Sequence, residues 1–327
     1  MSVDLITSAE ALEAVAPEWD ALWRRSTAAT PFQSPHWCLP WWKRFGSDDP
    51  FAIAVRSNGG LDCFAPLYIL RDEDSDESLG MFLGTGVTDY LDAVVAPGAD
   101  AAPLVEAMTA ADCQMWDLQQ MRPGSPLLSA ALPDSWSENV EDQDACPVLP
   151  IENAGEELQN LLSTHARKKL RYFRRGLERE GEVRYEAATI ENLDAFLLAL
   201  FDLHGLRWQR RGLPGVLADD VIREFHHDVA RRMLDAGALR MYAMRIGDRI
   251  AAVFYGFAHH DTVYYYLSGY DPDLEKLSLG NVIVAHAIEE AVRGGARTFD
   301  FLRGAEEYKY SWGAEDRVNR RRQLFRS

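Results

Sequence analysis

The stretch from Val263 to Tyr310 constrains the fold of this 327-residue chain more than any other part of it. Its first residues, Val263 to Ser268, are mostly β-branched or aromatic, which predicts a strand. Asn281 to Val292 is apolar on nearly all sides, which predicts a buried helix, and Thr298 to Leu302 is typical of a second short strand. A strand, a helix and a strand in this order predict a crossover between two parallel strands.

The start of the predicted helix is a candidate phosphate site. The chain enters it through Ser278, Leu279, Gly280 and Asn281. The first N–H groups of a helix have no partners within it, and they lie at the positive end of the helix dipole. We therefore expect this segment to be able to bind a phosphate or a pyrophosphate.

Three phrases around this helix carry a resemblance to a known family. They are Gly269-Tyr270-Asp271-Pro272, Phe299-Asp300-Phe301-Leu302-Arg303-Gly304 and Glu307-Tyr308-Lys309-Tyr310-Ser311-Trp312-Gly313. In these phrases the chain resembles the CelD/BcsL-like (BioF2-like) acetyltransferases of the GNAT superfamily, which are relatives of the FemAB transferases. The resemblance is strong from about Ser163 to Gly313 and fainter from Pro31 to Val95. It implies an α/β (α+β) fold of tandem GNAT-like domains, each with a mixed, mostly antiparallel sheet flanked by helices.

The distribution of charge predicts where the two domains meet. Residues 1–150 contain 7 Lys and Arg against 24 Asp and Glu, whereas residues 151–327 contain 27 of each. This shift predicts a boundary near Pro147–Pro150. We expect an acidic N-terminal domain at 1–150, catalytically degenerate because it has no cofactor loop, and an acyltransferase domain at 151–327. The acidic excess also disfavours binding to DNA.

Other features exclude several classes of protein. No apolar run approaches the roughly 20 residues of a membrane span, and the acidic N-terminus does not resemble a signal peptide. The four cysteines are scattered and lack the spacing of a metal site: Cys38, Cys63, Cys113 and Cys146. We therefore expect a cytoplasmic protein with reduced thiols and without a metal. The sequence does not predict an oligomeric state.

The resemblance implies acyl-CoA, such as acetyl-CoA, as co-substrate. The N–H groups from Ser278 to Asn281 would then hold the CoA pyrophosphate. A main-chain N–H near Leu267, Ser268 and Gly269 would bind the thioester oxygen. By resemblance, the acceptor is an amine on a nucleotide sugar or on an exopolysaccharide precursor. The GNAT loop Arg/Gln-x-x-Gly-x-Gly/Ala is reduced here to a single glycine, Gly280.

Four residues near the second strand are candidates for catalysis. Asp300 or Glu306 would take a proton from the amine through water, and Tyr308 would protonate the leaving thiolate. Lys309 matches the lysine of a FemAB-like Tyr-Lys phrase and would stabilise developing negative charge. The alternatives are that Asp300 points outward from its strand and that Tyr308 only packs.

Two further phrases match the family and are candidates for substrate binding, together with Arg303. Asp89, Tyr90 and Asp92 resemble an Asp-Tyr-x-Asp phrase, with turn capping as the alternative. His204, Arg207 and Trp208 match a His-x-x-Arg-Trp phrase on a predicted helix. The alternative for His204 is a satisfied histidine in the core.

Two clusters of arginines lie in the second half of the sequence, one in a predicted helix and one in a predicted strand. Arginines recur four apart as Arg167, Arg171, Arg175 and Arg179, and so form one stripe of a helix. This stripe is either a solvated face or a wall for an anionic partner, such as CoA phosphates, a nucleotide sugar or an RNA. Residues 320–322 are three arginines in a predicted final strand, Arg317 to Phe325, and we expect them to be solvated.

Two alternative functions remain open at this point. The FemAB relatives imply aminoacyl-tRNA as donor, which the arginine stripe would suit. The reduced phosphate loop would also fit a non-catalytic subunit of polysaccharide biosynthesis.

Overall fold

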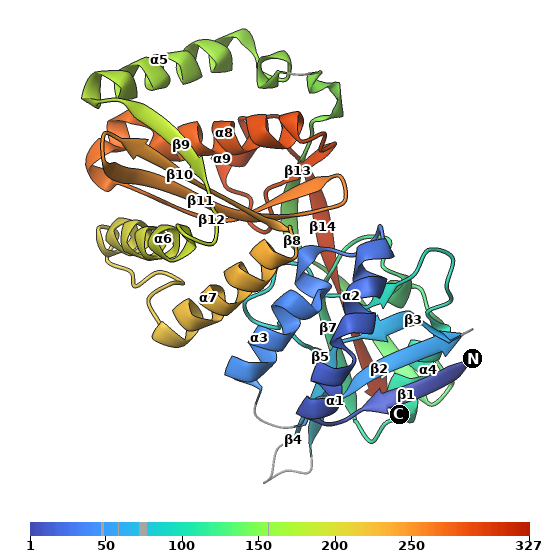
Figure 1. The fold of residues 1–327 in the computed structure, drawn as a ribbon. Coiled ribbons are helices and arrows are strands. Elements are labelled where there is room, and N and C mark those ends of the chain that lie inside the picture. Colours follow the sequence, from blue (N-terminus) through green and yellow to red (C-terminus); the bar gives the residue numbers. More distant parts are fainter. Residues whose placement is uncertain (47–48, 58, 72–76, 156) are drawn as a thin grey trace. The chain divides into compact units, whose positions relative to one another are not determined.

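The computed structural model describes residues 1–46, 49–57, 59–71, 77–155 and 157–327. Its chain divides into two compact units (Figure 1). Unit 1 contains Met1–Ala145 and Arg317–Ser327, and unit 2 contains Cys146–Asp316. The final residues thus belong to unit 1, whereas the sequence placed them in a domain at 151–327; that domain assignment stays a prediction. None of the helices in the described ranges has the length and apolar character of a membrane span.

Unit 1 contains two sheets flanked by helices. One has the strand order β1-β2-β3-β6, and the other begins β4-β5-β7-β14-β8. Most of the pairs are antiparallel, and β5 with β7 is parallel. The elements are β1 (Ser2–Ile6), α1 (Ala9–Ala14), α2 (Ala16–Arg25), η1 (Pro31–Gln33), α3 (Pro35–Phe45), β2 (Ala52–Ser57), β3 (Gly60–Ala65), β4 (Leu67–Arg71), β5 (Ser78–Phe82), β6 (Val94–Val95), α4 (Ala102–Ala110), β7 (Met115–Met121), η2 (Pro126–Leu128), β8 (Trp136–Pro150) and β14 (Glu315–Arg326).

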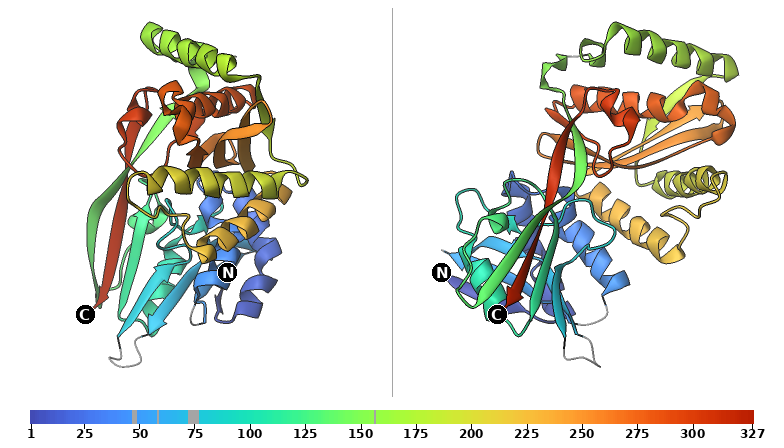
Figure 2. Two further views of the ribbon diagram at one scale, coloured as in Figure 1. Left: turned by 90° about the vertical axis from the view of Figure 1, so that its left-hand side faces the viewer. Right: turned by 180° about the vertical axis from the view of Figure 1, so that it is seen from behind.

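Unit 2 is built on the strand order β8-β13-β12-β11-β10-β9. Helices α5 and α8 cover one face of this sheet, and α6 covers the other with α7 beside it (Figures 1 and 2). The elements are η3 (Glu152–Ala154), η4 (Leu158–Asn160), α5 (Thr164–Glu180), β9 (Val183–Ala187), α6 (Leu193–Gln209), α7 (Asp220–Asp235), β10 (Leu239–Ile246), β11 (Arg249–His259), β12 (Thr262–Tyr270), η5 (Pro272–Leu277), α8 (Leu279–Arg293), β13 (Thr298–Asp300) and α9 (Glu307–Tyr310). The predicted fold class, mixed and mostly antiparallel sheets flanked by helices, is confirmed.

The predicted crossover is present in unit 2. Strands β12 and β13 are parallel, with Thr262 opposite Thr298 and Tyr264 opposite Asp300, and α8 connects them. Nine of the fifteen residues of α8 are buried, as its apolar sequence predicts. These residues form a core with β10, β11 and β12, so burial of apolar surface fixes α8 on the sheet.

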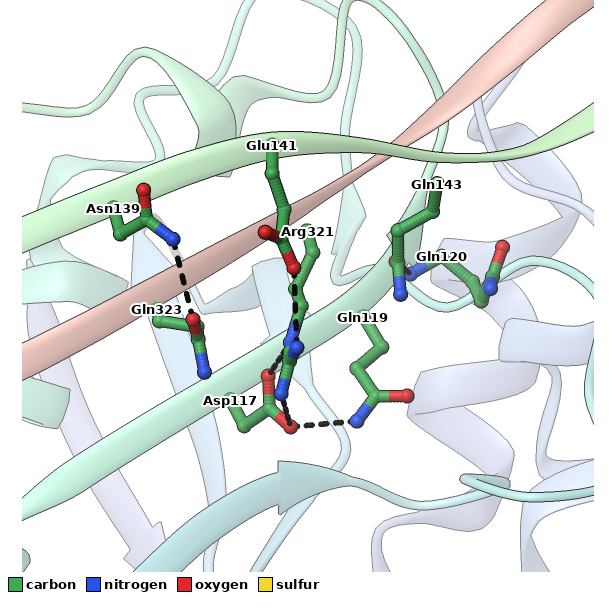
Figure 3. Close-up of polar contacts among 8 residues, drawn as sticks. All are labelled: Asp117, Gln119, Gln120, Asn139, Glu141, Gln143, Arg321 and Gln323. Atoms are coloured by element: carbon green, nitrogen blue, oxygen red, sulfur yellow. Dashed lines mark hydrogen bonds and ion pairs between the residues drawn. The ribbon is translucent and has the colours of Figure 1, made fainter.

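The arginines of β14 correct one prediction, because they are paired rather than simply solvated. Arg321 donates to Asp117 Oδ1 at 2.6 Å and Oδ2 at 3.0 Å, and to Glu141 at 3.1 Å (Figure 3). Arg322 is 2% exposed and donates to Glu138 and to the carbonyls of Leu127 and Ala130. The last strand therefore supplies cations to the acidic first part of the chain.

Candidate active site

A β-bulge in β12 creates the first feature of the site. Tyr265 lies opposite Gly256 and Leu267 lies opposite Tyr255, so Tyr266 is an extra residue in the ladder. Residues three apart in a regular strand point to opposite faces. The extra residue brings Tyr265 and Ser268 to the same face, and their hydroxyl oxygens are 2.6 Å apart.

Tyr308 extends this pair into a chain of three hydroxyl groups. The phenols of Tyr308 and Tyr265 lie close enough to affect each other's ionisation, and their interaction raises the pKa of Tyr308 and lowers that of Tyr265. Burial is the largest influence on both groups, and it raises the pKa of each above its ordinary value. Both phenols are therefore protonated near neutral pH. We call Tyr308, Tyr265 and Ser268 the hydroxyl chain.

The hydroxyl chain lies just beyond the point where two strands separate. Pairing between β12 and β13 is described only from Thr262 to Tyr264. After β13 the backbone turns, with φ of 57° at Leu302 and 105° at Gly304, and α9 begins at Glu307. This turn directs Tyr308 back toward Tyr265.

Lys309 holds the turn in shape. Its side chain is 3% exposed, and Nζ lies 3.2, 2.7 and 3.0 Å from the carbonyl oxygens of Leu302, Arg303 and Gly304. Nζ also lies 2.9 Å from the carboxylate of Glu306. An ammonium group has three N–H donors, so these contacts occupy all of them. Lys309 therefore holds the turn before α9, and its role in stabilising developing negative charge stays a prediction.

Asp300 also belongs to the turn. Its side chain is fully buried, which excludes the alternative that it points into solvent. Oδ1 accepts the main-chain N–H of Leu302 at 2.8 Å. Glu306 is exposed, and Arg303 is partly exposed. A role for any of these three residues in proton transfer or substrate binding stays a prediction.

Helix α6 approaches β12 closely because Gly269 has no side chain. A Cβ atom there would lie 2.9 Å from the carbonyl oxygen of Leu200 and 3.0 Å from the amide nitrogen of His204, both in α6. Gly269 thus brings the predicted His-x-x-Arg-Trp phrase against the end of β12. This packing role is separate from the predicted contact with a thioester.

His204 is held in one tautomer. The indole N–H of Trp208 donates to His204 Nε2 at 2.9 Å, so the imidazole proton is on Nδ1. Burial, and secondarily the charge of Arg207, lower the pKa of His204 to about 4, so the ring is neutral at pH 7. Nδ1 is buried and has no hydrogen-bond partner within the described ranges. The site therefore contains a buried donor that the protein leaves unused.

Arg207 connects α6 to the other parts of the site. Its guanidinium lies 4.8 Å from the centre of the Tyr270 ring, and its charge lowers the pKa of Tyr265 and of Tyr308 against the effect of burial. Its Nε is buried and has no hydrogen-bond partner among the residues described. Tyr270 in turn packs on Gly280, where a Cβ would lie 3.0 Å from its ring. Arg207 is thus near both the hydroxyl chain and the start of α8.

The start of α8 keeps its main-chain donors. Ser278 is left-handed, with φ 52° and ψ 47°, and its side chain makes no capping hydrogen bond to the helix backbone. Its Oγ instead accepts from the side-chain amide of Asn281 at 2.8 Å. The N–H groups of Leu279, Gly280 and Asn281 belong to the first turn, where a helix provides no acceptors. These residues could hold an anionic part of a cofactor.

The remaining predicted residues lie elsewhere. Asp89, Tyr90 and Asp92 are in unit 1, where Tyr90 is buried and the main-chain carbonyl of Asp89 accepts from Asn319 at 3.1 Å. Arg171 is exposed on α5. Sequence reasoning missed Tyr265, whose only local signal was a run of aromatic residues that predicted a strand. It quoted Tyr270 as part of a family phrase but gave it no role.

The family comparison matches the part of the chain that holds this site. Residues 164–310 match the family model described as "Acetyltransferase (GNAT) domain". The matched stretch is less than half of the chain, and it is similar to GNAT-type acetyltransferase domains. It contains α6, the bulge of β12, the start of α8 and α9. No curated protein matches the sequence.

Solved structures resemble the whole chain. A crystal structure of FemX has a TM-score of 0.70 at 13% identity and covers 98% of this chain and 97% of that one. The structure of L-PGS from Bacillus licheniformis has a TM-score of 0.60 at 11% identity, covering 100% and 94%. The C-terminal domain (DUF2156) of a putative lysylphosphatidylglycerol synthetase from Agrobacterium fabrum has a TM-score of 0.60 at 12% identity, covering 97% and 92%. At these identities the likeness shows the fold alone.

Proposed function

We propose that residues 164–310 form a GNAT domain that moves an acyl group from acyl-CoA to an amine. The hydroxyl chain at the separation of β12 and β13 is the observation that carries this proposal, because it places a protonated phenol beside buried donors. The acceptor that the CelD/BcsL-like resemblance implies is a nucleotide sugar or an exopolysaccharide precursor.

The proton balance of the reaction suits the hydroxyl chain. The amine attacks the thioester carbonyl, a C–N bond forms and the C–S bond breaks; the amine loses a proton and the thiolate gains one. Tyr308 is protonated near neutral pH, so its hydroxyl can donate a hydrogen bond to the departing sulfur and pass on a proton as it receives one from the hydroxyl chain. The proton that the amine loses enters this relay at Ser268 and reaches Tyr308 through Tyr265, since each hydroxyl group is both donor and acceptor.

The unused donors suit an oxygen-rich ligand. Nδ1 of His204 and Nε of Arg207 are buried and lack protein acceptors in the described ranges, which is costly unless a ligand supplies acceptors. Arg207 carries a charge that would stabilise an oxyanion or a phosphate. In this proposal the first-turn N–H groups of α8 hold the CoA pyrophosphate.

Release of free thiol from acetyl-CoA in the presence of a mixture of amines tests the proposal. We expect turnover by the wild-type protein, and a loss of about a hundredfold or more in kcat for Tyr308→Phe with little change in acetyl-CoA binding. Tyr172→Phe is the matched control, because Tyr172 is 67% exposed on α5. Absence of turnover with every amine would favour a non-catalytic protein. A wild-type kcat in Tyr308→Phe would show that Tyr308 is not the proton donor.

An aminoacyl-tRNA donor is a second candidate, favoured by α5. Residues 164–175 contain six Lys and Arg and no acid. Arg174 is paired with Glu289 of α8, but four of the others are exposed: Lys168, Lys169, Arg171 and Arg175. This candidate predicts RNA binding that weakens steeply with salt and is lost in Arg171→Glu/Arg175→Glu. Arg24→Glu/Arg44→Glu in unit 1 is the charge-matched control.

A further inference from the structure

Unit 1 contains a cavity that the acyl-transfer proposal does not use. Its volume is about 340 Å³, within the range of small-molecule sites. Both apolar and charged side chains line it, including Ala93 and Val95 on one hand and Asp92, Arg122 and Arg317 on the other. A cavity with opposite charges and an apolar wall can distinguish ligands by charge and by shape.

Asp92 lines this cavity, and only one of its carboxylate oxygens is hydrogen-bonded within the described residues. Oδ1 accepts the main-chain N–H of Ala93 and the hydroxyl of Ser125, both at 2.8 Å. Oδ2 has no hydrogen-bond donor among the described residues. Ser125 is itself fixed, because its Oγ also accepts the N–H of Leu127 at 3.2 Å. The carboxylate is thus oriented by its neighbours while half of its acceptor capacity stays unused.

Arg122 provides a fixed cation on the same cavity. Its guanidinium lies 5.5 Å from the centre of the buried Tyr90 ring, and one of its N–H groups donates to the carbonyl of Ala28. Four N–H donors of the guanidinium are not used in that bond. Arg317 comes from β14, far away in the sequence, and adds a second guanidinium to the lining.

We propose that this cavity binds a small zwitterion, namely an α-amino acid with an apolar side chain. Its ammonium group would pair with Asp92, and its carboxylate with Arg122. Guanidinium groups bind carboxylates through two parallel hydrogen bonds, which fixes the orientation of the ligand. The apolar side chain would then lie against Ala93 and Val95. This inference does not depend on the acyl-transfer proposal, since it concerns unit 1 alone.

Calorimetric titration of the full chain with three related compounds tests the inference. L-leucine carries both charges, 4-methylpentanoate lacks the ammonium group, and 3-methylbutylamine lacks the carboxylate. We expect leucine to bind about tenfold or more tightly than either analogue, because each missing charge loses one set of charged hydrogen bonds.

Two variants assign the charges to residues. Asp92→Asn should weaken leucine binding about tenfold and leave 4-methylpentanoate unchanged, whereas Arg122→Gln should weaken both. Asp112→Asn and Arg24→Gln are the controls, because the side chain of Asp112 is 97% exposed and that of Arg24 is 49% exposed. Circular dichroism verifies that each variant is folded. If Arg122→Gln does not fold, Arg122→Lys replaces it, which keeps the charge but loses the paired geometry and should still weaken both acids.

Three outcomes would overturn the inference. They are no measurable binding of leucine to the wild-type protein, equal binding of leucine and either analogue, and wild-type affinity for leucine in Asp92→Asn. Each would show that the cavity does not recognise both charges of an amino acid.

Discussion

His204 carries its proton on Nδ1 and remains neutral at physiological pH, because Trp208 donates to Nε2 and burial lowers its pKa to about 4. A His-x-x-Arg-Trp phrase in a sequence does not reveal this state. It depends on the close approach of α6 to β12, which a single glycine permits. The structure thus gives the tautomer and the protonation state of a side chain, which the sequence does not.

The protonation of His204 predicts how stability depends on pH. An unfolded histidine titrates near its ordinary pKa of 6.5, whereas folded His204 titrates near 4. Between pH 4 and pH 6.5 the unfolded chain binds one more proton at His204 than the folded chain. The contribution of neutral His204 to the free energy of unfolding is therefore complete above pH 6.5 and is lost as the pH falls toward 4. His204→Gln, whose side-chain oxygen can accept from Trp208, should remove up to about 3 kcal/mol of this dependence.

Urea unfolding of wild type and His204→Gln at several pH values measures this effect. His165→Gln is the control, because His165 is exposed at the start of α5. Parallel curves for His204→Gln and wild type would contradict the assigned protonation state.

At the scale of elements, much of unit 2 was predictable from the sequence. The strand at Thr262–Tyr270 and the buried helix at Leu279–Arg293 follow from local composition and periodicity, which predicted them at Val263–Ser268 and Asn281–Val292. The bulge at Tyr266 was not predictable, because it is defined by a register between two strands. The hydroxyl chain depends on that bulge. The sequence therefore predicted roles for Tyr308 and Ser268 but not that the two residues belong to one hydroxyl chain.

The contact between α6 and β12 gives a prediction about two glycines. Gly269→Ala should destabilise the protein by about 1–3 kcal/mol, because its Cβ would lie 2.9 Å from a main-chain oxygen of α6. Gly205→Ala, in α6 itself, should be neutral or stabilising by up to about 1 kcal/mol, since a Cβ there meets nothing within 4 Å. Thermal and urea unfolding of both variants measure the difference. Equal stability of the two would mean that α6 does not approach β12 so closely.

At the scale of the whole molecule, the assignment of the last strand was the least predictable feature. Arg321 and Arg322 pair with Asp117 and Glu138, which lie 204 and 184 residues earlier in the chain. Nothing local in a run of three arginines indicates such partners, and the expectation of a solvated run was therefore wrong. Arg320 is the most solvated of the three arginines, because its side chain is 51% exposed, although it pairs with Asp142.

Removal of residues 317–327 should destabilise unit 1 selectively. The deletion exposes the core around Leu324 and leaves Asp117 and Glu138 without their arginines. Limited proteolysis followed by mass spectrometry should show rapid cleavage within 1–145 and continued protection within 146–316. Arg320→Gln is the control and should resemble wild type, because exposed ion pairs contribute about 0–1 kcal/mol. Unchanged protection of residues 1–145 in the deletion variant would contradict the assignment of β14.

Both ends of the chain lie in unit 1, and unit 2 is the segment between them. A ribosome therefore makes all of unit 2 before it makes β14, the last strand of unit 1. Residues 1–145 cannot complete their fold until residues 317–327 have emerged from the exit tunnel. Unit 2 has all its residues earlier and can complete its fold while translation continues.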